Sequence, residues 1–296
     1  FLLYPKYASH LSSLLFCHIF DLATILHQFI NHCRYVPSIL NLRYNKLRGI
    51  TMINRFSRTQ RVIGRDALHK IQRAHVIVFG VGGVGGYAIE ALARSGIGKI
   101  DIVDHDTVSL TNINRQLIAT DATIDQYKVN VMKERIHTIS PDTIVNALPI
   151  FYLPETKDQF DLSQYDYIID AIDNVTAKID LIVTAKSLGV PIISAMGCGN
   201  RFDPTKVCVM DIYDTKNDPL AKVMRHELRA HNIKDLQVCC STEAPIKPIE
   251  YSDEEQEKAV KWSIPGSTAF VPPVAGITLA AEVVRQITNF DPNNRK

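Results

Sequence analysis

Short apolar runs alternate with helical patterns from residue 74 onward. The first run, "HVIVFG", is nearly all apolar and rich in β-branched residues, as expected for a strand covered on both faces. Further strands are predicted at "KIDIVDHD", "IVNALPIF", "YDYIIDAI" and "VPIISAM", and helical spacing falls over 84–95, 126–140 and 174–187. This repetition predicts an α/β fold with a doubly wound, Rossmann-like, mostly parallel sheet.

The last third of the chain changes character. Two more strands are predicted at "KVCVMDIYDT" and "LQVCCST", for which an antiparallel arrangement is one option, around a charged helix from Asp218 to Asn232. The polar stretch Lys247 to Lys261 predicts a surface loop. A final helix over 274–289 is apolar on most of its circumference, which predicts packing into a core or a dimer interface.

Residues 1–51 show neither a sustained period nor the order of a signal peptide. Met52 is a more natural start, so we expect the first fifty-one residues to be a non-native or disordered extension. The alternative is a genuine arm with an amphipathic helix between Leu11 and Ile30.

Composition narrows the class of protein. Thirty-three basic and 31 acidic residues give a net charge of +2, which neither indicates nor excludes a nucleic-acid ligand. Six cysteines without a CxxC pair favour a reduced, cytoplasmic protein and predict no structural zinc. No run of 18 apolar residues occurs, so no membrane span is expected.

A glycine-rich loop follows the first predicted strand. Gly80, Gly82 and Gly85 satisfy GxGxxG where a strand ends and a helix begins, and Gly83 adds a further glycine. Such a loop lets the backbone approach phosphates, and Asp104 at the end of the next strand is placed to bind ribose hydroxyls. Alone, these features favour a nicotinamide dinucleotide. Some of the glycines alternatively serve only tight packing of helix on strand.

The next segment, "DHDTVSLTNINRQL", shifts the balance toward a triphosphate. It places Asn112, Asn114, Arg115 and Gln116 just beyond the acidic strand end, and Lys128 follows near a helix start. A guanidinium and an ammonium near a glycine loop suit ATP better than a nicotinamide dinucleotide. Each cation alone is also explained as a solvated surface residue.

A third motif, "DYIIDAIDNVTAK", puts Asp170, Asp173 and Asn174 at the carboxyl edge of the predicted sheet. A carboxylate beside a triphosphate is a common Mg²⁺ ligand, and this predicts a metal role for Asp173. The alternative is that Asp173 caps the following helix, and both roles are compatible.

Together these motifs resemble those of the adenylating enzymes of ubiquitin-activating type, which include the activators of molybdopterin synthase and of thiamine-sulfur carrier proteins. The shared pattern is GxGGVG, DxDxVxxxNxxRQ, a lysine and DxxDN, matched by 80–85, 104–116, Lys128 and 170–174. The resemblance implies catalytic roles for Arg115 and Lys128 on the ATP phosphates and for Asp173, through Mg²⁺. The second arginine of "RFSR", Arg58, would reach the ATP site of a second subunit, which implies a homodimer. The full set of ATP-binding residues implied by the resemblance is Gly80, Gly82, Gly83, Gly85, Asp104, Asp106, Asn112, Arg115, Gln116, Lys128, Asp173, Asn174 and, across the dimer, Arg58.

Within that family the chain looks like the members that dehydrate threonylcarbamoyladenosine in tRNA. The segments that carry this likeness include "EALARSGIGKIDIVD", "DPLAKVMRHELR", "STEAP" and "AFVPPVAG". The resemblance implies one adenylating domain over 52–290, with a nucleotide-binding core at about 74–200 and a substrate and dimer part at about 201–290. Such an enzyme activates the threonine carboxylate with ATP and closes a ring, releasing AMP and pyrophosphate. The alternatives are an activator of a ubiquitin-like sulfur-carrier protein, a nicotinamide-dependent oxidoreductase and, more remotely, a pseudo-enzyme.

Two features remain open. Some family members carry a cysteine linked to a sulfur-relay partner just before the STEA motif, but here Val238 takes that position. Cys239 and Cys240 are therefore better explained as buried strand residues, and a slip in register is the alternative. Basic residues at 222, 225, 229 and 234 offer a surface for tRNA, although a solvated helix face explains them equally well.

Overall fold

The computed structural model of the chain describes residues 53–248 and 265–293. The expected extension over 1–51 lies outside the described residues, as does nearly all of the expected loop Lys247 to Lys261. Contacts divide the chain into Phe1–Arg55 and Phe56–Lys296, and every element described below belongs to the second unit.

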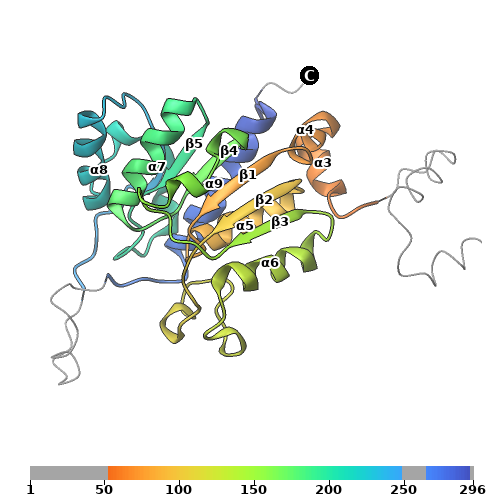
Figure 1. The fold of residues 1–296 in the computed structure, drawn as a ribbon, viewed down its shortest axis with the longest axis horizontal. Helices are drawn as coiled ribbons and strands as arrows, with labels where there is room; N and C mark the ends of the chain where they lie inside the picture. Colours follow the sequence, from red (N-terminus) through yellow and green to blue (C-terminus); the bar gives the residue numbers. More distant parts are fainter. Residues whose placement is uncertain (1–52, 249–264, 294–296) are drawn as a thin grey trace, which may run out of the picture. The chain divides into compact units, whose positions relative to one another are not determined.

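A seven-stranded sheet forms the centre of this unit (Figure 1), with the strand order β3-β2-β1-β4-β5-β7-β6. The strands are β1 (His75–Phe79), β2 (Lys99–Val103), β3 (Ile144–Leu148), β4 (Tyr167–Asp170), β5 (Ile192–Ala195), β6 (Val207–Asp211) and β7 (Gln237–Ser241). Every pairing is parallel except that of β6 with β7. The expected mostly parallel α/β sheet with added C-terminal strands is therefore confirmed, and the antiparallel option applies to β6 alone.

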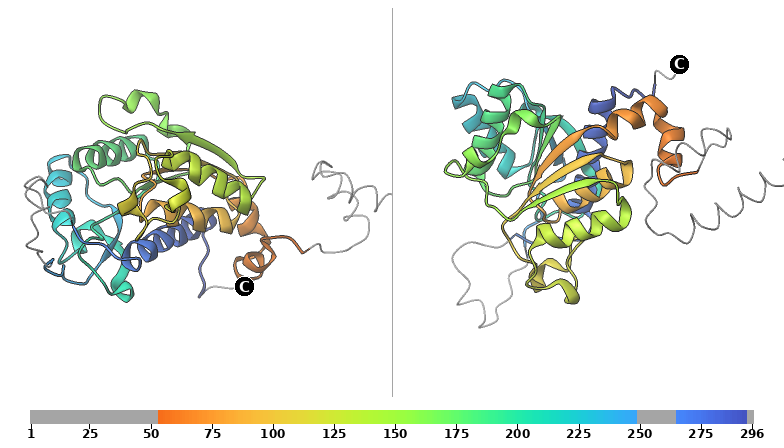
Figure 2. Two further views of the ribbon diagram at one scale, coloured as in Figure 1. Left: turned by 90° about the horizontal axis from the view of Figure 1, so that it is seen from below. Right: turned by 45° about the vertical axis from the view of Figure 1, so that its right-hand side comes forward.

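Helices cover both faces of the sheet (Figures 1 and 2). They are α3 (Ser57–Ile63), α4 (Arg65–Ile71), α5 (Gly85–Ser95), α6 (Lys128–Ile139), α7 (Val175–Leu188), α8 (Pro219–Ala230) and α9 (Val271–Thr288). Short 3-10 helices are η1 (Leu110–Asn112), η2 (Asp121–Thr123), η3 (Lys157–Gln159), η4 (Leu162–Gln164), η5 (Pro204–Lys206) and η6 (Ile212–Asp214). Helices α4, α5, α6 and α9 share one core with the sheet, and α7 and α8 share the other. No helix in the described part of the chain is long and apolar enough to cross a bilayer.

Local chemistry explains where the helices begin. The Asp218 carboxylate accepts the Ala221 N–H and thereby caps α8. Helix α9 begins three residues earlier than the pattern indicates, because prolines are tolerated in a first turn, where their missing N–H groups have no partner.

Helix α9 packs into the core against α5, so the first of the two options for this helix applies. A Cβ atom on Gly276 would lie 2.2 Å from the Val84 carbonyl oxygen. Only glycine allows this approach, and α9 therefore supports the segment that begins α5.

Candidate nucleotide-binding site

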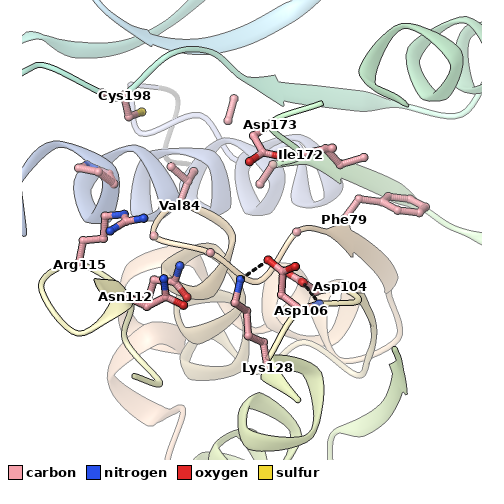
Figure 3. Close-up of a pocket in the computed structure, with 18 of the residues that line it drawn as sticks. Phe79, Val84, Asp104, Asp106, Asn112, Arg115, Lys128, Ile172, Asp173 and Cys198 are labelled. Carbon is pink, nitrogen blue, oxygen red and sulfur yellow. Dashed lines mark hydrogen bonds and ion pairs between the residues drawn. The ribbon is translucent and has the colours of Figure 1, made fainter. Parts of the chain in front are cut away.

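A cavity of about 530 Å³ lies at the carboxyl ends of the central strands (Figure 3). At β1 the strand order reverses, because β2 and β3 lie on one side of β1 and β4 and β5 lie on the other. Open α/β sheets bind their ligands at such a switch point. The segments that line the cavity include the glycine loop after β1, the acidic end of β2, the loop after η1, the start of α6, the segments after β3, β4 and β5, and residues 265–267 before α9. The lining includes these expected residues: Gly80, Gly82, Gly83, Asp104, Asp106, Asn112, Arg115, Gln116, Lys128 and Asp173. Three expected residues, Gly85, Asn174 and Arg58, do not line it.

The glycines of the loop meet different demands. Gly80 has a φ of 95°, and a Cβ atom there would lie 2.5 Å from the Ala171 carbonyl oxygen. A Cβ atom on Gly85 would lie 1.9 Å from the Gly80 carbonyl oxygen. Packing alone therefore requires these two glycines.

Gly82 is the exception. The nearest atom to a Cβ at this position is Gln116 Nε2, at 4.0 Å, so no neighbour in the described residues demands a glycine there. The missing side chain leaves the backbone open to the cavity, close to where α5 begins at Gly85. An exposed backbone beside a helix N-terminus is suited to a phosphate group.

The Asp104 carboxylate is fixed at the end of β2. Its Oδ2 accepts the Val81 N–H at 2.7 Å, and its Oδ1 accepts the Asp106 N–H at 2.9 Å. The remaining lone pairs of the two oxygens can accept further hydrogen bonds. This arrangement is suited to ribose hydroxyls beside the glycine loop.

Two cations line the same cavity from different elements. Lys128, at the start of α6, is 5% exposed, and its Nζ lies 2.6 Å from Asp106 Oδ2. The Arg115 guanidinium donates to the Thr111 carbonyl at 2.9 Å and to Asn114 Oδ1 at 2.9 Å. In Figure 3 the Lys128 ammonium points to Asp106, and the Arg115 guanidinium lies on the side of Val84. Two positive charges around an open glycine loop are suited to a polyphosphate.

Gln116 gives a second indication of a ligand. Its side chain is 7% exposed, and its Oε1 has no hydrogen-bond partner among the described residues. A buried polar atom without a partner costs free energy unless a ligand or a water satisfies it. Gln116 lines the cavity beside Gly82, so the residues present fit a bound polar molecule.

On the other side of the cavity, Asp173 follows β4 (Figure 3). Within 53–248 and 265–293, no hydrogen bond or ion pair reaches its exposed carboxylate. The capping alternative for Asp173 is wrong, because Asn174 Oδ1 accepts the Ala177 N–H at 3.0 Å and caps α7. Asp173 is therefore free to bind a cation, whereas Asn174 has a structural role.

His105 and Phe151 also line the cavity, although no sequence pattern predicted them. The His105 ring lies 4.2 Å from that of Phe151, and its Nε2 lies 3.3 Å from Asp106 Oδ1. Ligand atoms of Asp104, His105 and Asp106 lie within 4.8 Å of one another, although both carboxylates already have partners. Sequence spacing gave no signal for His105, since no second histidine accompanies it.

The cysteines near the site are poor nucleophiles. Cys198 lines the cavity, and burial raises the pKa of its thiol to about 12. Cys239 and Cys240 are buried on β7, and burial raises both thiol pKa values, that of Cys240 to about 12. All three thiols are therefore protonated at neutral pH. The expected sulfur-relay partner stays a prediction.

Comparison with known proteins shows the family of this chain. A tRNA threonylcarbamoyladenosine dehydratase of Bacillus subtilis (strain 168) is 44% identical over 243 residues, which make up 80% of this chain and 95% of that protein. Crystal structures of the E. coli tRNA N6-threonylcarbamoyladenosine dehydratase TcdA, one in complex with AMP and one with ATP, give TM-scores of 0.72 and 0.71. Both are 33% identical and cover 79% of this chain and 94% of the E. coli chain. The ThiF family model matches residues 56–296, and this chain therefore belongs to the ThiF family.

Proposed function

We propose that this chain uses ATP to dehydrate N6-threonylcarbamoyladenosine in tRNA to its cyclic form, releasing AMP and pyrophosphate. The observation that carries the proposal is the 44% identity to a dehydratase of that name over 95% of its length. The cavity supports it, because the cations Arg115 and Lys128 and the Asp173 carboxylate surround an open glycine loop.

The reaction requires activation of a carboxylate, which is a poor electrophile. A threonine carboxylate oxygen attacks the α-phosphorus of ATP, and the bond to pyrophosphate breaks. A nitrogen or oxygen of the same modified nucleoside then attacks the activated carbonyl and displaces AMP, so that the nucleoside loses one water. Arg115 and Lys128 would stabilise the negative charge that builds as pyrophosphate departs, an effect worth about 3 kcal/mol for one well-placed donor.

Asp173 is the proposed carboxylate for a magnesium ion that is bound through the nucleotide. Bound there, magnesium would offset phosphate charge and orient the leaving group. Asp104 would hold the ribose, and Gly82, Asn112 and Gln116 would contact the nucleotide.

The test is a digestion and mass measurement on tRNA that carries threonylcarbamoyladenosine. After incubation with ATP, magnesium and the protein, the modified nucleoside should be lighter by one water, and AMP should appear in equal amount. ATP binding without any loss of water would reject the proposal. AMP formation only with a carrier protein would favour the alternative activator, and tight NADH binding without ATP binding would favour an oxidoreductase.

We also propose a homodimer in which Arg58 of each subunit completes the other subunit's site. Arg58 is exposed on α3 and does not line the cavity of its own chain. Arg58→Ala and Arg115→Ala variants should each be inactive alone. Mixed dimers would carry one complete site each, so an equal mixture should recover about a quarter of the natural activity. Failure to recover activity in a mixture shown to exchange subunits would reject the shared site.

A further inference from the structure

Three buried polar side chains meet where β4 ends, behind the cavity. Asp170 is the last residue of β4, Ser194 lies directly opposite it on β5, and Lys178 projects from α7. All three are 0% exposed. Asp170 Oδ2 lies 2.9 Å from Lys178 Nζ and accepts the Ser194 hydroxyl at 2.5 Å. This cluster lies outside the lining of the cavity, so it does not itself touch a ligand there.

The cluster fixes the residue that precedes Asp173. Asp170 Oδ1 accepts the Ile172 N–H at 3.1 Å, and Lys178 Nζ donates to the Ile172 carbonyl at 3.1 Å. On the other side, Asn174 is fixed as the cap of α7. Asp173 therefore follows a residue whose backbone is held, Ile172, and precedes one whose side chain is held, Asn174. Its own carboxylate has no partner in the described part of the chain.

The charges of the cluster are matched. Because Lys178 is paired with Asp170, its positive charge is not available to neutralise Asp173. Within the described residues, the carboxylate that faces the cavity thus has no cationic side chain paired with it. Buried ion pairs are often no better for stability than apolar residues of similar volume, so stability alone is a weak reason for this pair.

We propose that Lys178, together with Asp170 and Ser194, is a positioning residue that holds Asp173 toward magnesium-bound nucleotide. This inference rests on the proposed function only in assigning that ligand to the cavity. When the cluster is lost, the Asp173 carboxylate is still present, but the backbone of Ile172 beside it is no longer held in one position. The effect falls on the magnesium-dependent part of ATP binding, while Asp104, Arg115 and Lys128 still bind the nucleotide without metal.

The test uses variants of graded severity in the full chain. Ser194→Ala removes one neutral hydroxyl, Lys178→Met removes the cation, and the double variant Asp170→Asn/Lys178→Met removes both charges, so that no buried charge is left unpaired. Glu90→Gln is the matched control, because Glu90 is also a buried carboxylate in ion pairs but lies on α5 outside the cavity lining.

Two measurements separate positioning from general damage. Hydrogen exchange of the ligand-free protein should be faster at the Ile172 amide in Lys178→Met and unchanged there in Glu90→Gln. The magnesium concentration that half-maximally promotes ATP binding should rise about tenfold in Lys178→Met and less in Ser194→Ala, the lower end of the cost of losing a residue that orients a metal ligand. ATP affinity in EDTA should stay unchanged.

Coupling to Asp173 decides the result. In an Asp173→Asn background, Lys178→Met should add nothing to the magnesium requirement. An equal effect in that background, or an equal effect of Glu90→Gln, would overturn the positioning role. These binding measurements do not need the tRNA reaction, so a chain that binds magnesium and ATP without dehydrating tRNA would refute the proposed function and leave this inference standing.

Discussion

The glycine loop makes a sharp prediction, because its glycines answer to different constraints. Gly85→Ala puts a Cβ atom 1.9 Å from the Gly80 carbonyl oxygen, so the loop and the start of α5 would have to separate by about 1 Å. Overpacking of this kind costs about 1–3 kcal/mol of unfolding free energy or more. In the described part of the chain, Gly82→Ala meets nothing closer than 4.0 Å, and Gly82 is not among the glycines with positive φ.

Gly82→Ala should therefore leave the fold intact and damage binding. The free energy of unfolding should be unchanged or higher by about 0.4–1 kcal/mol, because alanine restricts the unfolded chain. The new methyl group would occupy the space that we assign to a phosphate, and we expect the dissociation constant for ATP to rise at least tenfold, or about 1.4 kcal/mol.

Urea unfolding gives the free energy of unfolding of Gly82→Ala and Gly85→Ala, and titration calorimetry gives the dissociation constant of each variant for ATP. Unchanged ATP affinity in a folded Gly82→Ala variant would refute the phosphate assignment. A marked loss of stability in the same variant would refute the packing argument instead.

Three further predictions follow from the same geometry. Lys128→Met should lower the rate of AMP formation by a factor of about 10²–10³, the usual cost of losing one hydrogen-bond donor to the charge that develops in the transition state. A rate within a factor of three of the natural one, measured in a discontinuous assay, would contradict this. Gly276→Ala should lower the free energy of unfolding by about 1–3 kcal/mol, since its Cβ atom would lie 2.2 Å from the Val84 carbonyl oxygen, and a melting temperature equal to that of the natural chain would argue against close α5–α9 packing. Burial raises the thiol pKa of Cys198 and Cys240 from 9.0 to about 12, so between these values the folded chain holds protons that the unfolded chain releases. The stability that the two thiols contribute should therefore be fully present below pH 9 and be lost as the pH rises toward 12. The free energy of unfolding should fall by at most about 1.4 kcal/mol per pH unit for each thiol. Urea unfolding at a series of pH values should show a shallower fall for the Cys198→Ala/Cys240→Ala variant.

The mostly parallel central sheet followed from the sequence, because buried parallel strands appear as short apolar runs separated by helical patterns. The edge of the sheet was harder to predict. Strand β6 precedes β7 along the chain but lies outside it and runs antiparallel, and neither apolar run carries a signal for that exchange. Helices α3 and α4 were missed, because the segment 57–71 is dominated by polar and charged residues and shows no clear apolar stripe.

Lys178 shows why the positioning cluster could not be predicted. A lysine within a helical pattern is nearly always a surface residue, so the sequence around Lys178 does not predict that this side chain is buried. Burial becomes visible only when the register of β4 and β5 places Ser194 opposite Asp170 and α7 brings Lys178 over both. Asp170 itself was expected at the sheet edge, but its carboxylate faces the interior and Asp173 alone of the two lines the cavity.

The residues that determine which ligand binds are those that the fold itself does not require. Gly80 and Gly85 would be needed for packing whichever phosphate compound the loop binds, and Asn174 is needed to begin α7. They are compatible with a dinucleotide and with ATP alike. Among the described residues, Gly82 and Asp173 have no structural neighbour that requires them, and the packing around them would tolerate other residues. Such positions carry the functional information of the site, and they are the ones at which substitution should separate ligand binding from stability.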